Sequence, residues 1–134
     1  MLDKKLDIVA VCIGIAKEIY NDLGSGFNEC VYQKAFEVSL RLKGIKYESQ
    51  RVTPIFFKGF YIGEGEIDLV VYGEEKLVVE LKATALDLSV KEEIQIRKYM
   101  TCLKINQGLL INFRQSDRKV VPEVPEIIQI DTRT

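Results

Sequence analysis

An acid-x-lysine tripeptide, and an aspartate twelve residues before its acid, are the side chains of this sequence best suited to chemistry. The tripeptide is Glu80-Leu81-Lys82 and the aspartate is Asp68. Two carboxylates held close together repel each other, so that one takes up a proton or both bind a cation. Mg²⁺ accepts oxygen ligands from one or two carboxylates and keeps several waters. A lysine beside such an ion can position a water or stabilise negative charge that develops in a reaction.

Two short runs of alternating apolar residues predict a hairpin that would position these side chains. The runs cover 66–72 and 76–83 and are separated by Gly73-Glu74-Glu75. Their alternating apolar residues are Ile67, Leu69 and Val71 in the first run, and Leu77, Val79 and Leu81 in the second. Burying both sets on one face requires a register centred on Glu74, because a slip of one residue would turn one whole set to solvent.

This register places charged side chains opposite one another on the other face of the hairpin. Asp68 would pair with Glu80, and Glu66 with Lys82. Directly opposed side chains have Cβ atoms about 5 Å apart. The pairing therefore predicts that Asp68 and Glu80 can share one ion. The alternative is a solvated face on which Glu66 and Lys82 form a surface ion pair of little energetic value.

Further candidates lie on two predicted helices. Glu29 falls in the first turn of a helix over 28–43, where an acid also favours the helix dipole. Tyr32 lies three residues further on, on the same face, and is expected in the core by default. Gln95 and Tyr99 are four residues apart on a later helix and share a face, which is also typical of a half-buried polar stripe.

Periodicity and breakers predict an α/β domain with the order helix, helix, meander, helix, strand. Helices are expected over 6–20, 28–43 and 89–103, strands over 47–57, 66–72, 76–83 and 108–113, and an irregular edge strand over 127–130 in a tail from about 114. The run over 108–113 is continuously apolar, which is typical of a strand buried on both faces. Pro54 suggests an edge or a bulge, and Gly63-Glu64-Gly65 suggests a flexible break before the second strand.

Composition excludes several classes of site. The 134 residues fit one domain over 1–134, and 47% hydrophobic residues suffice for one core. The formal net charge of -1 does not indicate a strongly basic DNA-binding domain, so a nucleic-acid contact would rely on a local patch plus bound metal. The sequence has no histidine, which excludes histidine acid–base chemistry and most zinc sites.

Cysteine usage and hydropathy indicate a cytoplasmic protein. Cys12, Cys30 and Cys102 are far apart and odd in number, which predicts buried thiols and no disulfide frame or metal-ligand set. No apolar run is long enough to span a bilayer. The N-terminal apolar stretch is interrupted by charge at helical spacing, so we expect an amphipathic helix there and no signal peptide.

Several motifs together resemble those of the GxxExxY proteins, a compact branch of the PD-(D/E)xK nuclease superfamily. The signature is Gly26-Phe27-Asn28-Glu29-Cys30-Val31-Tyr32, and the similarity continues through 63–65, 68–71, 79–83, Gln95 and 108–113. It covers the chain from about Ile8 to Phe113. The resemblance implies a restriction-endonuclease-like core, in which a mixed central sheet (a three-stranded antiparallel meander plus a parallel strand) is flanked by helices.

The resemblance also implies roles for the candidate residues. The RecB-like group of the superfamily carries an acid on an N-terminal helix, an Asp, an E-x-K and a Q-x-x-x-Y. Here these correspond to Glu29, Asp68, Glu80-Leu81-Lys82 and the pair Gln95 and Tyr99. The three acids would hold Mg²⁺ or Mn²⁺, and the lysine would join them in catalysis. The glutamine and tyrosine would enter the same pocket from a second helix and orient the substrate. Two positions depart from the pattern: Glu66 lies just ahead of the aspartate, and Glu92 stands where members often carry a histidine.

Two functions of different classes are compatible with these residues. The first is a metal-dependent nuclease that hydrolyses phosphodiester bonds in DNA. The second is a catalytically inactive module on the nuclease fold that binds nucleic acid or a protein partner, which the balanced net charge and Glu66 favour. A small homo-oligomeric structural protein is a third alternative. No recognition domain is evident in the sequence, so a protein partner is expected to supply any sequence specificity.

Overall fold

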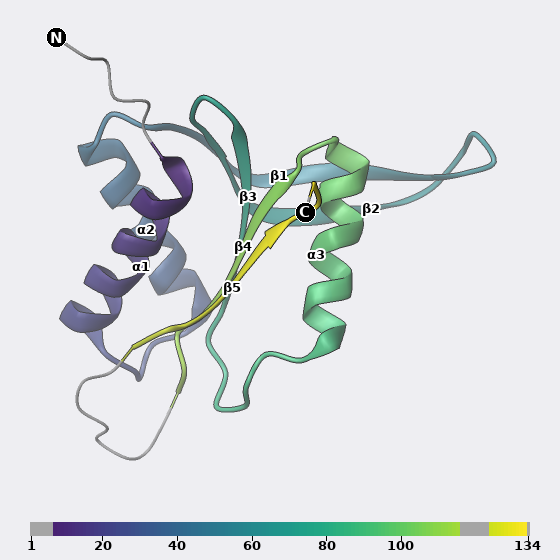
Figure 1. Cartoon of the computed structure of the whole chain (residues 1–134). Coiled ribbons are helices and arrows are strands. Elements are labelled where there is room, and N and C mark those ends of the chain that lie inside the picture. Colours follow the sequence, from purple (N-terminus) through teal and green to yellow (C-terminus); the bar gives the residue numbers. More distant parts are fainter. Residues whose placement is uncertain (1–6, 116–123, 134) are drawn as a thin grey trace, which may run out of the picture.

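Five strands form one mixed sheet in the order β1-β2-β3-β4-β5 (Figure 1). In this computed structural model, which describes residues 7–115 and 124–133, the strands are β1 Lys46–Phe57, β2 Phe60–Tyr72, β3 Lys76–Lys82, β4 Gln107–Asn112 and β5 Glu126–Asp131. The first three form an antiparallel meander, β4 runs parallel to β3, and β5 pairs antiparallel with β4 at the edge. The predicted mixed sheet and the predicted edge strand in the tail are confirmed.

Helices cover both faces of this sheet. α1 (Ile8–Leu23) and α2 (Glu29–Leu42) lie on one face and α3 (Val90–Leu103) lies on the other (Figure 1). Each begins at a capping residue: the Asp7 carboxylate accepts from two N–H groups of the first turn of α1, and Asn28 does so once for α2. Ser89 begins α3 in a capping box. Among these described helices, none is long and apolar enough to cross a membrane.

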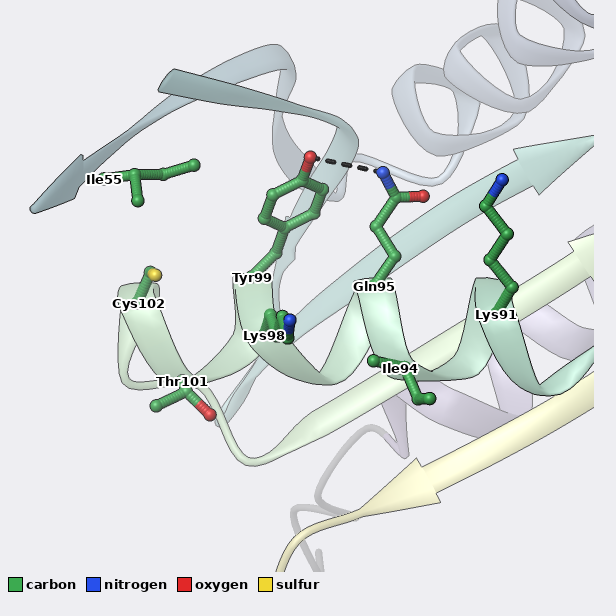
Figure 2. A pocket seen from close by; sticks show the side chains of 8 residues that line it. All are labelled: Ile55, Lys91, Ile94, Gln95, Lys98, Tyr99, Thr101 and Cys102. Atoms are coloured by element: carbon green, nitrogen blue, oxygen red, sulfur yellow. Dashed lines mark hydrogen bonds between the residues drawn. The ribbon is translucent and has the colours of Figure 1, made fainter. Parts of the chain in front are cut away.

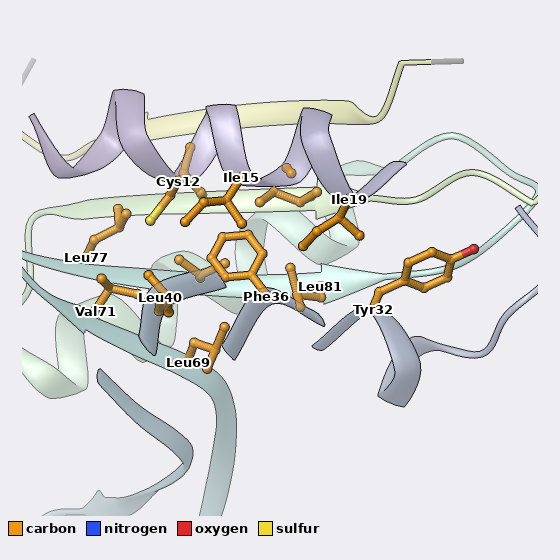
Figure 3. Packing of buried hydrophobic residues seen from close by; sticks show 14 of the residues in the cluster. Cys12, Ile15, Ile19, Tyr32, Phe36, Leu40, Leu69, Val71, Leu77 and Leu81 are labelled. Atoms are coloured by element: carbon orange, nitrogen blue, oxygen red, sulfur yellow. The ribbon is translucent and has the colours of Figure 1, made fainter. Parts of the chain in front are cut away.

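The two faces of the sheet bury separate hydrophobic clusters. On the α1 and α2 face, the largest fully buried side chains include Tyr32, Phe36, Leu40, Leu69, Leu77 and Leu81 (Figure 3). On the α3 face, Ile67, Val70, Val78, Ile96 and Met100 are buried together. β3 and β4 contribute to both clusters, which explains why the sequence of β4 is continuously apolar.

The long hairpin of β1 and β2 differs from the prediction. The expected break at Gly63-Glu64-Gly65 is wrong, because these residues pair with Ile55, Pro54 and Thr53 inside β2. The register shifts by one residue between Ile55 and Phe56, next to the proline that suggested an irregular edge. The glycine at 65 serves packing instead: a Cβ there would lie 2.3 Å from the Tyr99 ring.

Two of the three cysteines are not buried. Cys12 lies on the buried side of α1, and burial raises the pKa of its thiol to about 12. Cys30 and Cys102 are exposed, so the prediction of three buried thiols is wrong for both. Cys30 lies on the outer side of α2, whose inner side carries Tyr32 and Phe36. The prediction of an irregular tail touches residues 116–123, including Pro122, which lie outside the described residues.

Candidate active site

β2 and β3 separate at Asp68 and Glu80, and the two carboxylates lie between their backbones. The ladder pairs Leu69 with Val79, Val70 with Val78, Val71 with Leu77 and Tyr72 with Lys76, so the register centred on Glu74 is confirmed over these pairs. Beyond them, the Asp68 N–H donates to Glu80 Oε1 at 3.0 Å. The Leu81 N–H donates to Asp68 Oδ2 at 2.8 Å. Each acid therefore accepts a backbone hydrogen bond from the opposite strand where the ladder ends.

β1 is distorted at the position opposite Asp68. Ser49 pairs with Leu69 and Arg51 with Ile67, while Gln50 between them has a φ of 51°. On β2, Leu69 packs in the cluster of α1 and α2, whereas Ile67 packs in the cluster of α3. The alternation of side chains is thus broken at Asp68. The expectation that Ile67 shares a face with Leu69 is wrong, because this local distortion turns Ile67 to the other side of the sheet.

Glu29 and Asp68 line one cleft between α2 and the β1–β2 pair. Its volume is about 480 Å³, and its lining also includes Gln33 and Gln50. The Gln33 side-chain amide donates to the Asp68 backbone carbonyl at 3.3 Å. The Gln50 amide in turn donates to Gln33 Oε1 at 2.8 Å. The structure thus brings the helix acid and the strand acid to the same cleft.

Two of these residues were missed in the sequence. Gln33 lies four residues after Glu29, on the same helical face, so its spacing offered a signal. Gln50 offered none, since glutamine has no special preference for the left-handed conformation that it adopts here. Gln33 holds the Asp68 backbone directly and Gln50 holds Gln33, whereas Glu29 is a lining residue of the cleft.

The three acids are crowded electrostatically. Burial raises the pKa of Glu80 to about 8, and the negative charge of Asp68 raises it as well. Burial also raises the pKa of Asp68, against the opposing hydrogen bond from Leu81. The pKa of Glu29 is raised first by burial and then by the charge of Asp68. At neutral pH the site therefore favours a shared proton or a bound cation over three free negative charges.

Lys82 supplies the positive charge of this cluster. It is half-buried at the end of β3, and its charge lowers the pKa of Asp68, Glu80 and Glu29. Its strand neighbour is Asn112 of β4. The expected pairing with Glu66 is wrong, because β2 and β3 part before reaching these residues. Lys82 is thus left to act on the acids of the cleft.

The turn before α2 explains why Glu29 reaches the cleft. Gly26 has a φ of 117°, which favours glycine, and its N–H donates to Gln115 Oε1 at 2.7 Å. Tyr32 is fully buried and its hydroxyl donates to the Gly24 carbonyl at 2.7 Å. Its ring stacks on Phe113 with centroids 4.5 Å apart. The glycine and tyrosine of the motif therefore fix the start of the helix, and Glu29 is its first residue.

Replacing Tyr32 with phenylalanine should lower stability while leaving the fold intact. The variant keeps the ring stack but loses the hydrogen bond to Gly24 and the one received from the Gln115 amide at 3.1 Å. We expect the free energy of unfolding to fall by about 1–3 kcal/mol, as for a buried hydrogen bond with one partner removed. Urea denaturation followed by circular dichroism measures the change. The exposed Tyr61→Phe is the control and should cost less than about 0.5 kcal/mol; equal losses in the two variants would contradict the anchoring role.

Gln95 and Tyr99 line a different cavity. It has a volume of about 580 Å³ and lies between α3 and β1, where Ile55 faces the helix (Figure 2). The Gln95 amide donates to the Tyr99 hydroxyl at 3.4 Å. None of the three acids nor Lys82 lines this cavity. The expectation that both residues enter the pocket of Asp68 is therefore not met by the cavity lining, although Tyr99 packs against Gly65, three residues before Asp68.

Glu92, one of the two positions that depart from the motif pattern, is used by the helix itself. Its carboxylate accepts from the N–H of Ser89 at 2.8 Å and from the Ser89 hydroxyl. These hydrogen bonds lower its pKa, so it stays negatively charged. Lys82 is close enough for its charge to lower this pKa further. The N-terminal end of α3 therefore lies near the acid cluster.

The donor set at the end of the β2–β3 ladder fits a divalent cation that prefers oxygen. Within the described residues, Asp68 and Glu80 each use one carboxylate oxygen for a backbone N–H, which leaves the second oxygen of each for a ligand. Among the described residues, no group of three Cys, Asp or Glu side chains is arranged so that it could hold a metal ion by itself. Two carboxylates plus water match the way proteins hold Mg²⁺. Glu29 stands across the cleft as the third acid.

Comparisons with known proteins agree with this architecture. A model of the PD-(D/E)XK nuclease superfamily matches residues 6–124. The crystal structure of SSO0001 superposes with a TM-score of 0.56 at 17% identity, over 76% of this chain and 48% of that chain. A phage related exonuclease from Haemophilus somnus 129PT aligns with a TM-score of 0.43 at 14% identity, over 94% of this chain and 73% of that chain. No curated protein matches the sequence.

These likenesses differ in what they establish. The superposition on SSO0001 shows a shared fold, and this chain spans about half of that chain's length. The second superposition is too distant to carry an argument. The family model covers most of the sequence, including Glu29, Asp68, Glu80 and Lys82. The chain therefore belongs to the PD-(D/E)XK nuclease superfamily.

Proposed function

We propose that this chain is a metal-dependent nuclease that hydrolyses phosphodiester bonds in DNA. The observation that carries the proposal is the pair of carboxylates, Asp68 and Glu80, held where β2 and β3 part, with Lys82 beside them. Within the superfamily we assign the chain to the GxxExxY branch, on the signature around Glu29. A cytoplasmic location and a protein partner that supplies specificity stay predictions.

Each residue has a role that its position supports. Asp68 and Glu80 would hold Mg²⁺ or Mn²⁺ through the carboxylate oxygens that accept no backbone N–H. The ion would supply Lewis-acid chemistry by lowering the pKa of water and neutralising charge on the phosphate. Lys82 would orient the attacking water and stabilise the negative charge that develops on phosphorus. Glu29 would complete the ligand set from the other side of the cleft.

Gln95 and Tyr99 fit a role in guiding the nucleic acid. They form one edge of the cavity on α3, whose lining also carries Lys91 and Lys98 (Figure 2). The Gln95 amide and the Tyr99 hydroxyl, at this edge, can donate hydrogen bonds to a strand that passes it. The cavity does not include the acids, so this role is positioning and not chemistry.

An inactive binding module is the second candidate. The exposed Glu66 and the formal net charge of -1 favour it, because they oppose the approach of a polyanion to the cleft. The raised pKa of Glu80 opposes it, because a buried, crowded carboxylate is costly unless it serves a site.

Cleavage of end-labelled single-stranded and double-stranded DNA with Mg²⁺ or Mn²⁺ tests the proposal. We expect metal-dependent cleavage that is lost on adding a chelator. Asp68→Ala should lower the rate by more than about 100-fold, since even the outer partners of metal ligands cost about 10–100-fold. Glu66→Ala removes a nearby exposed acid and should retain activity. Absence of cleavage of both substrates, or equal rates in wild type and Asp68→Ala, would contradict the proposal.

A further inference from the structure

The tip of the β1–β2 hairpin, residues 54–63, extends past α3 and is here called the arm (Figure 1). Lys58 is its one charged residue. Its large apolar side chains are exposed: Phe56 by 59%, Phe57 by 59%, Phe60 by 75%, Tyr61 by 59% and Ile62 by 62%. Such a run is unusual on a monomer surface, where large contiguous apolar patches mark interaction sites.

Both faces of the arm are apolar. Phe56 pairs with Tyr61, their rings meeting edge to face with centroids 6.1 Å apart. Phe57 pairs with Phe60, and successive side chains point to opposite faces of a strand. Neither face is covered at the tip, and a two-stranded hairpin alone is at best marginally stable in water. The arm therefore needs a partner surface.

A suitable surface lies at the base of the same arm. The cavity on α3, about 580 Å³ in volume, has an apolar part formed by Ile55, Ile94 and Cys102 (Figure 2). Lys91 and Lys98 also line it. The β2 strand that leaves the arm carries the acids Glu64 and Glu66 directly after the apolar tip. An arm laid into this cavity from outside would thus bring aromatic side chains to an apolar wall and acids near lysines.

We propose that the occupant is a second copy of this chain, with each protomer's arm lying in the α3 cavity of the other. The arm and the cavity adjoin, so one two-fold axis can place both contacts in a single self-complementary interface. The exposed fractions of the four aromatic side chains add up to about two and a half fully exposed rings. This is roughly 400–600 Å² of exposed aromatic surface per copy. Two arms and the two cavity walls that they cover reach the roughly 1,200 Å² or more of a stable interface.

Charge disfavours nucleic acid as the partner that covers the arm. Backbone phosphates are bound by clusters of lysine and arginine. The arm offers Lys58 alone, and Glu64 and Glu66 follow it on β2. In a second copy, Lys91 and Lys98 of the cavity can instead lie near Glu64 and Glu66, the acids that follow the arm on β2.

Sedimentation velocity of the full chain tests this proposal by mass, independently of nuclease activity. We expect a concentration-dependent dimer in wild type. The double variant Phe57→Ser/Phe60→Ser should dissociate at least about 100-fold more readily, since buried aromatic residues dominate interface energies. Leu42→Ser, at a still more exposed apolar residue on α2, should dimerise as wild type does. All three positions are exposed, so the core is preserved.

Cross-linking then tests the placement of the arm. In a Cys30→Ser background, Lys58→Cys and the native Cys102 should be joined between two copies by a short bismaleimide, because Cys102 lines the cavity. The cross-link should vanish with Cys102→Ser. A wild type that stays monomeric, an arm variant that dimerises as tightly as wild type, or a cross-link independent of Cys102 would overturn the proposal. A monomer whose arm variant loses binding to a single-stranded oligonucleotide would also overturn it and assign the arm to nucleic acid.

Discussion

Asp68→Asn is expected to raise the melting temperature of the metal-free protein and to abolish its stabilisation by Mn²⁺ or Mg²⁺. The substitution removes one negative charge from beside Glu80, where the charge of Asp68 raises the pKa. The asparagine carbonyl can still accept the hydrogen bond from the Leu81 N–H. The variant therefore loses a partly buried negative charge, whose burial raises the pKa of Asp68, without losing the contact that holds the two strands together.

The metal dependence follows from linkage. A cation that binds only the folded protein stabilises it by about 2.7 kcal/mol at a hundredfold excess over its Kd. Asparagine is a poorer ligand for a divalent cation than a carboxylate, so this gain should disappear in the variant. Thermal unfolding of the two proteins, each with and without metal, measures both effects.

Glu66→Gln is the matched control, because Glu66 is an exposed acid on the same strand and a minor cause of the raised pKa of Asp68. It should leave both the metal-free melting temperature and the metal shift close to wild type. If wild type and Asp68→Asn instead melt together in both conditions, the acids form a solvated face and the metal site is refuted.

The sheet and its register could be predicted because they depend on local patterns. The alternation of Leu69 and Val71 against Leu77 and Val79 allows one register only, and the structure has it. The starts of α2 and α3 could be predicted at Asn28 and Ser89, because these side chains satisfy backbone N–H groups that the helix leaves free. Such signals are contained in a few neighbouring residues.

The shape of the site could not be read in the same way. The turn of Ile67 to the α3 face depends on Gln50, which is distant in sequence and adopts a positive φ without a glycine or asparagine to signal it. The Gln33 amide on α2 donates a hydrogen bond to the Asp68 carbonyl on β2, and only the folded chain brings these two elements together. Regular alternation therefore gave the wrong face for the residue next to the catalytic candidate.

The predicted flexibility of two glycines in β2 is wrong for a related reason. Gly63 and Gly65 suggested flexibility, yet both pair with β1 in a continuous strand. Pairing with β1 outweighs the low strand propensity of glycine, which depends strongly on context. The purpose of Gly65 is seen only when Tyr99 from α3 packs against it.

The raised pKa of Glu80 predicts that metal affinity depends steeply on pH. The pKa is about 8 in the folded protein against an ordinary value of 4.5. Between these values the folded protein keeps a proton on Glu80 that the unfolded chain has lost. For the metal-free protein, this group's contribution to stability is therefore complete below the ordinary pKa and is lost as the pH rises towards about 8.

A cation must displace that proton before it can bind Glu80, and its affinity rises with pH over the same window. For one proton released, the affinity should increase about tenfold per pH unit, or about 100-fold between about pH 5.5 and 7.5. Titration calorimetry with Mn²⁺ in buffers of different ionisation enthalpy measures both the affinity and the number of protons released. Glu80→Gln should bind weakly and without this pH dependence, while Glu66→Gln should keep the wild-type slope. A wild-type affinity that is constant across this range would show that Glu80 is already ionised in the folded protein, and that its burial does not regulate the binding of metal.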